Sequence, residues 1–168
     1  MRTALDTSWK IAHSVLTTSD RLLKSKIKLY PKCACGKLET TIHLLQECVD
    51  YNIVIQWFSR LLSNYLTTRF SLQPRHVLFG FGPREKYPPV FSVLLCITKH
   101  QFWVSHNIQV CFQSHACGCR EMPFQIRSSF RFHLRMQQSC RGTNAFYIEW
   151  LGSGIFGVIS AQLFSQTT

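Results

Sequence analysis

The chain has 168 residues and a formal net charge of +11, from 19 Lys and Arg against 8 Asp and Glu. Hydrophobic residues make up 46% of the chain, which excludes wholesale disorder, because disordered chains combine low hydrophobicity with high charge. The positive balance favours polyanionic partners such as RNA, DNA or anionic lipid. A merely basic protein without such a partner is the alternative.

The first residues, from Met1 to Asp6, contain no apolar segment of the kind that begins a secretory signal. We therefore expect an intracellular protein, nuclear or cytoplasmic, whose eight Cys are kept reduced and favour metal binding over disulfides. The apolar stretch 90–97 is too short to cross a bilayer. Residues 150–168 carry no charge but contain three Gly, so a membrane-associated tail is the less favoured interpretation.

Apolar residues recur at helical spacing along most of the chain and predict a mainly α fold. In the segment 50–66, the residues Ile53, Trp57, Leu61 and Tyr65 are expected to form the apolar stripe. A helix after Pro123 follows from the preference of proline for the first helical turn. The expected helices cover residues 6–16, a short segment from 17 or 19 that ends before Tyr30-Pro31, and residues 39–48, 50–66, 90–112 and 123–138.

The domain organisation is predicted from the positions of Pro and Gly, which interrupt helices. Residues 69–89 contain four Pro and two Gly and are interpreted as a linker. It separates a small helical module, residues 1–68, from a helical segment, residues 90–138. Residues 139–168 show little periodicity and are expected to form a weakly ordered tail.

Four possible metal ligands fall within sixteen residues: Cys33, Cys35, His43 and Cys48, with the spacing C-x-C-x7-H-x4-C. A structural zinc site uses four such ligands in a tetrahedron. Gly36 allows the chain to turn after the Cys pair, and His43 can meet Cys48 if the helix ends near Cys48. One residue between the first two Cys departs from the usual two to four. Four unrelated buried side chains, or a site that has lost its geometry, are therefore the alternative.

The order of these ligands and of their neighbours resembles a known family, the zinc-binding region near the C-terminus of reverse transcriptases of non-LTR (LINE-type) retrotransposons. Looser likenesses to vertebrate elements of this kind continue in residues 76–80 and 97–103. The resemblance implies a zinc role for Cys33, Cys35, His43 and Cys48. The matching pieces are Trp9-Lys10, residues 18–22, Cys33-Ala34-Cys35-Gly36, Glu39-Thr40, residues 43–45, Cys48 and Trp57.

The resemblance implies a detached piece of a retroelement polymerase that assists the handling of RNA or DNA. Polymerase chemistry needs clustered carboxylates for two metal ions, and the only Asp residues, Asp6, Asp20 and Asp50, are far apart in sequence. Neither a nucleotide-binding glycine motif nor a local Cys–His nucleophile pattern is present. We therefore expect no enzymatic activity and no small-molecule substrate.

Arg127, Arg131 and Arg135 recur every four residues in the last expected helix. Such a stripe can follow a phosphate backbone, and an ordinary solvated helix face is the alternative. A second dense group, formed by Cys111, His115, Cys117 and Cys119, is interpreted as free thiols rather than a second metal site.

The leading hypothesis is one structural Zn²⁺ that supports nucleic-acid binding. The alternative is a vestigial or protein-interaction module that binds no nucleic acid.

Overall fold

The computed structural model of the chain describes residues 2–27, 32–33, 35–82, 87–112 and 122–141. The described part is mainly helical, as the sequence predicted. Within it the only extended pairing is an isolated bridge between Lys32 and Leu38. The elements are α1 (Arg2–Ala12), α2 (Ser19–Lys24), the π-helix η1 (His43–Glu47), α3 (Val49–Leu66), α4 (Pro74–Phe79), α5 (Pro89–Phe112) and α6 (Met122–Arg141).

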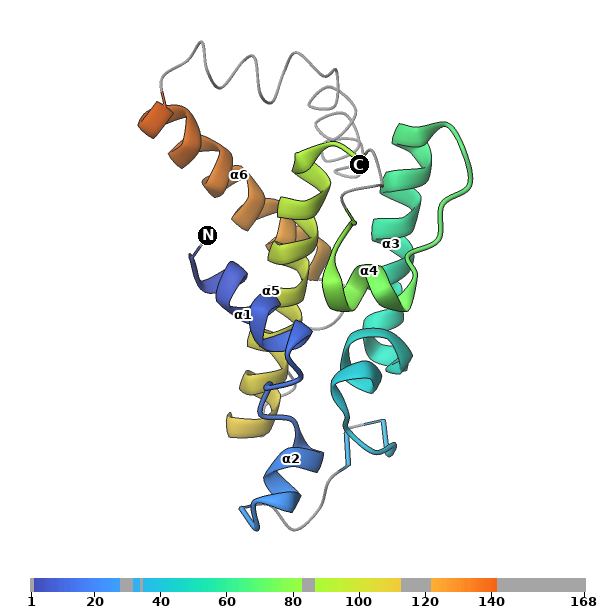
Figure 1. The fold of residues 1–168 in the computed structure, drawn as a ribbon, viewed down its shortest axis with the longest axis vertical. Coiled ribbons are helices and arrows are strands. Elements are labelled where there is room, and N and C mark those ends of the chain that lie inside the picture. The colour runs from blue at the N-terminus through green and yellow to red at the C-terminus, as the bar shows by residue number, and fades with distance from the viewer. Residues whose placement is uncertain (1, 28–31, 34, 83–86, 113–121, 142–168) are drawn as a thin grey trace.

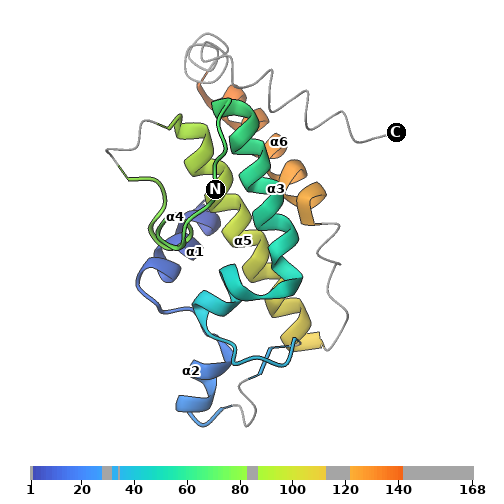
Figure 2. The ribbon, with the colours of Figure 1, turned by 90° about the vertical axis from the view of Figure 1, so that its right-hand side faces the viewer.

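Helix α5 is the centre of the fold. It contacts α1, α6 and η1, and Figure 1 shows α3 on one side of it and α1 and α6 on the other. The rings of Tyr51 and Phe102 lie 4.9 Å apart, and those of Tyr65 and Phe91 lie 5.0 Å apart. Because the start of α3 meets the later part of α5 and the end of α3 meets its start, the two helices run antiparallel (Figure 2).

The buried face of α3 differs from the predicted stripe. Leu61 is buried as expected, but Ile53 is 48% exposed, and Trp57 and Tyr65 are only partly buried. The buried positions are Tyr51, Val54, Phe58, Leu61 and Leu62, so the true stripe is rotated by about one residue from the predicted one. The expectation for Ile53 was wrong because the aromatic pairs with α5 set the rotation of the helix, and periodicity alone does not contain those pairs.

The segment 69–89, which the sequence predicted to be a linker, contains the helix α4. Pro74 lies in its first turn, where the missing N–H of proline costs nothing. Four rings of the segment contact one another and link the residues before α4 to those after it. They belong to Phe70, His76, Phe81 and Tyr87. Helix α4 also contacts α1 and η1, and one continuous core contains buried residues from Ile11 to Leu134.

Helix α6 begins beside Pro123, as predicted, and extends three residues beyond the expected end at Gln138. The remainder of the expected tail, residues 142–168, lies outside the described residues, and so does the irregular connection 113–121. Within the described residues, no helix combines the length and the apolar character that crossing a bilayer requires.

The assignment of the α3 faces predicts a contrast between two similar substitutions. Leu62 is fully buried, so Leu62→Ala should lower the free energy of unfolding by about 2–5 kcal/mol. Ile53→Ala removes a half-exposed side chain and should change it by roughly 0.5 kcal/mol or less. Urea denaturation followed by circular dichroism measures both, and equal losses would contradict the assignment.

Candidate metal centre

Cys33 and Cys35 lie on a tight hairpin that follows α2. The N–H of Cys33 donates to the carbonyl of Lys37 at 2.8 Å, and the N–H of Gly36 donates to the carbonyl of Cys33 at 2.9 Å. Gly36 has φ +85°, a left-handed conformation that strains any residue with a Cβ. The glycine that the sequence marked as a turn residue therefore closes the hairpin and brings both thiols to one side.

His43 and Cys48 lie at the two ends of the π-helix η1. The oxygen Oγ1 of Thr40 accepts the N–H of His43 at 3.0 Å and caps the start of this helical segment. The N–H of Cys48 then donates to the carbonyl of His43 at 2.8 Å, five residues back. This wide turn places the two ligands on the same side, and the extended backbone of Cys48 ends η1 before α3 begins.

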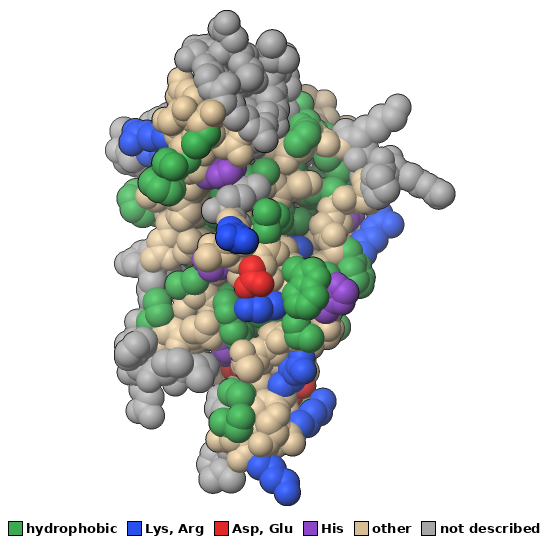
Figure 3. All heavy atoms as spheres, turned by 60° about the vertical axis from the view of Figure 1, so that its left-hand side comes forward, with side chains coloured by type: hydrophobic (Ala, Val, Ile, Leu, Met, Phe, Trp, Pro, Cys, Tyr) green, Lys and Arg blue, Asp and Glu red, His purple; other side chains and the backbone are tan. Residues whose placement is uncertain are grey.

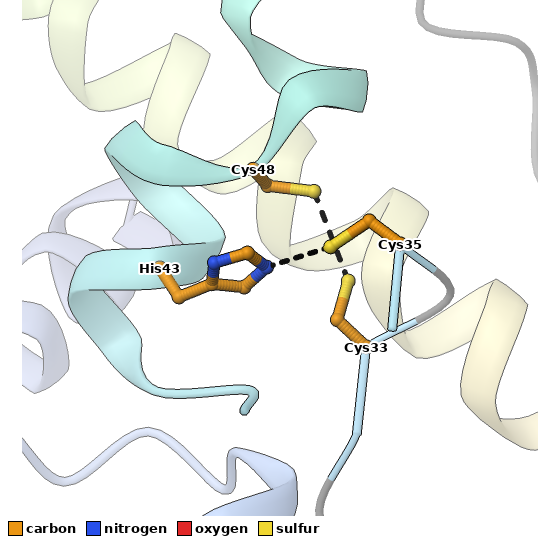
Figure 4. Close-up of side chains that lie close together, drawn as sticks. All are labelled: Cys33, Cys35, His43 and Cys48. Carbon is orange, nitrogen blue, oxygen red and sulfur yellow. Dashed lines mark hydrogen bonds between the residues drawn. The ribbon is translucent and has the colours of Figure 1, made fainter. Parts of the chain in front are cut away.

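The structure brings the four predicted ligands together (Figure 4). Their ligand atoms all lie within 4.8 Å of one another. The two Sγ atoms of Cys33 and Cys48 are 3.7 Å apart, too far for a disulfide, and Nε2 of His43 lies 3.1 Å from Sγ of Cys35. A tetrahedral ion with metal–sulfur bonds of about 2.3 Å has a sulfur–sulfur edge of about 3.8 Å. The cluster is therefore close to the size that one metal ion requires.

The surroundings of the cluster favour its metal-binding form. Cys33, His43 and Cys48 are buried, and Cys35 is partly exposed. Hydrogen bonding from the Cys48 side chain, helped by the backbone of Cys35 and opposed by burial, lowers the pKa of Cys33 to about 4. Metal binding needs the thiolate, and the lowered pKa of Cys33 favours that form.

Glu47 lies beyond the ligands, on the outer side of His43. Its Oε2 is 3.9 Å from Nδ1 of His43, while Nε2 of the same ring faces Cys35. Carboxylates in this place orient a ligating imidazole and increase its basicity. Four protein ligands fill a tetrahedron and leave no position for a reactive water, so the centre is suited to a structural role.

Glu39, between the hairpin and η1, is buried although it is an acid, with 2% of its surface exposed. Its Oε1 accepts the N–H of Ser19 at 2.7 Å, at the start of α2, and lies 3.3 Å from Nε2 of His106 in α5. In the sequence, Glu39 stands out only as part of a motif. Nothing in the local pattern points to His106, because the pairing depends on the packing of α5.

The three predicted nucleic-acid-binding arginines differ in their surroundings. Arg127 is half-buried, and its guanidinium lies 5.8 Å from the centre of the Trp57 ring on α3. Burial lowers its pKa. Arg131 is also half-buried, and Arg135 is exposed. Arg127 thus takes part in the packing of α6 on α3.

The second Cys and His group cannot be compared with its prediction. The side chain of Cys111 and the residues His115, Cys117 and Cys119 lie outside what the structure describes.

Comparisons with protein-family models, with curated proteins and with solved structures give no match for this chain. The family resemblance therefore stays a prediction.

The position of Glu39 predicts that its charge stabilises the fold around the metal centre. Glu39→Gln keeps the size of the side chain but removes half of a buried pair, and should lower the free energy of unfolding by about 3 kcal/mol or more. Asp6→Asn, at an exposed acid that pairs with Lys10 on α1 and lies away from the metal centre, serves as the control and should cost about 1 kcal/mol or less. Thermal and urea unfolding measure both variants, and equal effects would show that the Glu39 carboxylate has no special role.

Proposed function

We propose that the protein is a zinc-stabilised nucleic-acid-binding module without catalytic activity. The observation that carries the proposal is the convergence of Cys33, Cys35, His43 and Cys48 on one site. Thiolate and imidazole ligands in a closed tetrahedral set are typical of structural zinc. The single residue between Cys33 and Cys35 is compatible with this role, because both sulfurs already lie within the cluster.

Exposed cations on α2, just after it and on the ligand hairpin support the nucleic-acid part of the proposal. We call them the knuckle surface, which consists of the exposed cations among the described residues of 21–37, namely Arg21, Lys24, Lys26, Lys32 and Lys37. Figure 3 shows Lys and Arg side chains at the lower end of the molecule, where α2 lies in Figure 1. Of the acids nearby, Asp20 lies 3.6 Å from Lys24, Glu39 is buried, and Glu47 is exposed beside His43.

The knuckle surface is a better candidate for phosphate contacts than the arginine stripe of α6. Its five cations come from α2, from the residues just after it and from the ligand hairpin. The metal would fix the hairpin cations relative to η1, and Glu39 joins this region to Ser19 at the start of α2. On α6, Arg127 is engaged with Trp57, which leaves Arg131 and Arg135 as a secondary contact. The proposed origin as a detached retroelement reverse transcriptase region fits the same ligand set, because the resemblance implies zinc at these four residues.

An interaction with another protein is the second candidate function. Four large apolar side chains are exposed close to the ligands, on the hairpin, at η1 and on α3: Leu38, Ile42, Val49 and Ile53. Such a patch suits an apolar partner surface. Salt separates the two candidates, since phosphate contacts weaken steeply with salt and apolar contacts do not.

The zinc part of the proposal predicts about one Zn²⁺ per purified chain. Cys48→Ser removes one ligand and should lower the zinc content to a small fraction, with loss of stability. Cys140→Ser is the matched control, because Cys140 is exposed on α6 and lies outside the cluster. Elemental analysis by mass spectrometry measures the content. Zinc that is absent, or that is unchanged by Cys48→Ser, would overturn this part.

The nucleic-acid part predicts a local effect of charge reversal. The double variant Lys24→Glu, Lys37→Glu should weaken the binding of single-stranded RNA or DNA and reduce the salt slope by about 0.7 per lost phosphate contact. Arg60→Glu with Arg69→Glu makes the same change in net charge at exposed positions on and after α3. Fluorescence anisotropy across a salt series measures both. Equal losses would indicate only non-specific attraction, and binding without a salt slope would favour the apolar interface.

A further inference from the structure

A cavity of about 720 Å³ lies between α1, α5 and α6 and is not part of the metal centre. This volume falls within the range of about 300–1,000 Å³ that is usual for small-molecule sites. Its walls come from α5, from α6 and from the sequence-distant α1, so the cavity exists only in the folded protein. None of the four metal ligands lines it.

The described lining of the cavity contains no ionic side chain. Among the described residues that line it there is no Asp, Glu, Lys or Arg, in a chain whose net charge is +11. Its apolar wall is formed by Ala4, Ile97, Phe132 and Met136. Two histidines also line it, His100 and His133. Burial and, after it, the positive charge of the N-terminus lower the pKa of each, which favours the neutral ring at physiological pH. A charged ligand would find no ionic side chain in this lining with which to pair.

The hydrogen bonds of His100 define which of its nitrogens is free to accept. The hydroxyl of Thr7 donates to the carbonyl of Thr3 at 2.9 Å, so its single proton is already used. The same oxygen lies 2.9 Å from Nδ1 of His100. In this arrangement Nδ1 donates to the Thr7 oxygen, and the neutral ring keeps Nε2 as an acceptor.

Gln137 adds a second acceptor to the same cavity. Its Oε1 is buried and has no hydrogen-bond partner within the described part of the chain. A buried carbonyl without a donor is costly, and a ligand that brings an N–H or O–H group removes that cost. The lining thus combines an apolar wall with acceptor atoms on α5 and α6.

We propose that this cavity binds a neutral small molecule that has an apolar body and at least one N–H or O–H donor. The proposal is independent of zinc and of nucleic-acid binding. A ligand of this class fills the volume between the three helices, buries its apolar body against Phe132 and Met136, and donates to Nε2 of His100 or, once the Gln137 side chain turns toward the cavity, to its carbonyl. The absence of ionic side chains from the lining selects against carboxylates, phosphates and amines.

The test uses three related fluorescent probes with the full-length, metal-loaded protein. The probe N-phenyl-1-naphthylamine is neutral and carries one N–H donor. Its sulfonated analogue, 1-anilinonaphthalene-8-sulfonate, adds a negative charge, and its N-methyl analogue removes the donor. We expect the neutral probe to bind at one site, the sulfonate about tenfold more weakly, and the N-methyl compound roughly threefold to tenfold more weakly.

A pair of variants places the binding in the cavity. Thr3 lines the cavity, and its neighbour Leu5 is exposed on α1 and does not. Thr3→Phe fills the entrance and should weaken the neutral probe about tenfold, while Leu5→Phe should leave its affinity within about twofold. Stronger binding of the sulfonate, which the net charge alone would favour, would overturn the proposal. So would equal affinities of the two variants, or no binding of the neutral probe to the folded protein.

Discussion

The buried carboxylate of Glu39 is the constraint on which the rest of the structure depends. A charge removed from water must be paired, and Glu39 finds its partners on two elements that are distant in sequence, Ser19 at the start of α2 and His106 on α5. The next residue, Thr40, caps the segment that carries His43. One side chain thus fixes the basic end of the molecule and the ligand-bearing turn relative to the central helix.

The metal centre and the hydrophobic core share the same short segment. In η1, His43 faces the other ligands, while Leu44 and Leu45 are fully buried in the core. The hairpin of Cys33 and Cys35 has few apolar side chains with which to hold its own shape. An ion that binds both parts would therefore stabilise the hairpin against η1, and the core would stabilise η1 in turn. Metal binding to this cluster would therefore be coupled to folding.

Much of the fold and most of the centre follow from the sequence, because helical periodicity and ligand spacing are local properties. The four candidate ligands and the helices α3, α5 and α6 are examples. The rotation of α3 about its axis does not follow from the sequence, because it depends on the packing of Tyr51 and Tyr65 against α5. Helix α4 was not predicted, because the prolines of its segment indicated a linker, although Pro74 lies in the first turn of the helix. The pairing of Glu39 with His106, and the position of Arg127 over Trp57, arise only when distant helices meet.

The π-turn of η1 also has a consequence for how this chain can change in length. A turn closed from Cys48 back to His43 contains one residue more than an α-helical turn. Removing that residue would restore ordinary helix geometry, but it would rotate everything after it by about 100°. If the four ligands stayed together, Phe58 and Leu62 would then be turned out of the core. The spacing between His43 and Cys48 therefore fixes the rotation of α3 about its axis relative to the ligands. We expect insertions and deletions there to be far less tolerated than substitutions.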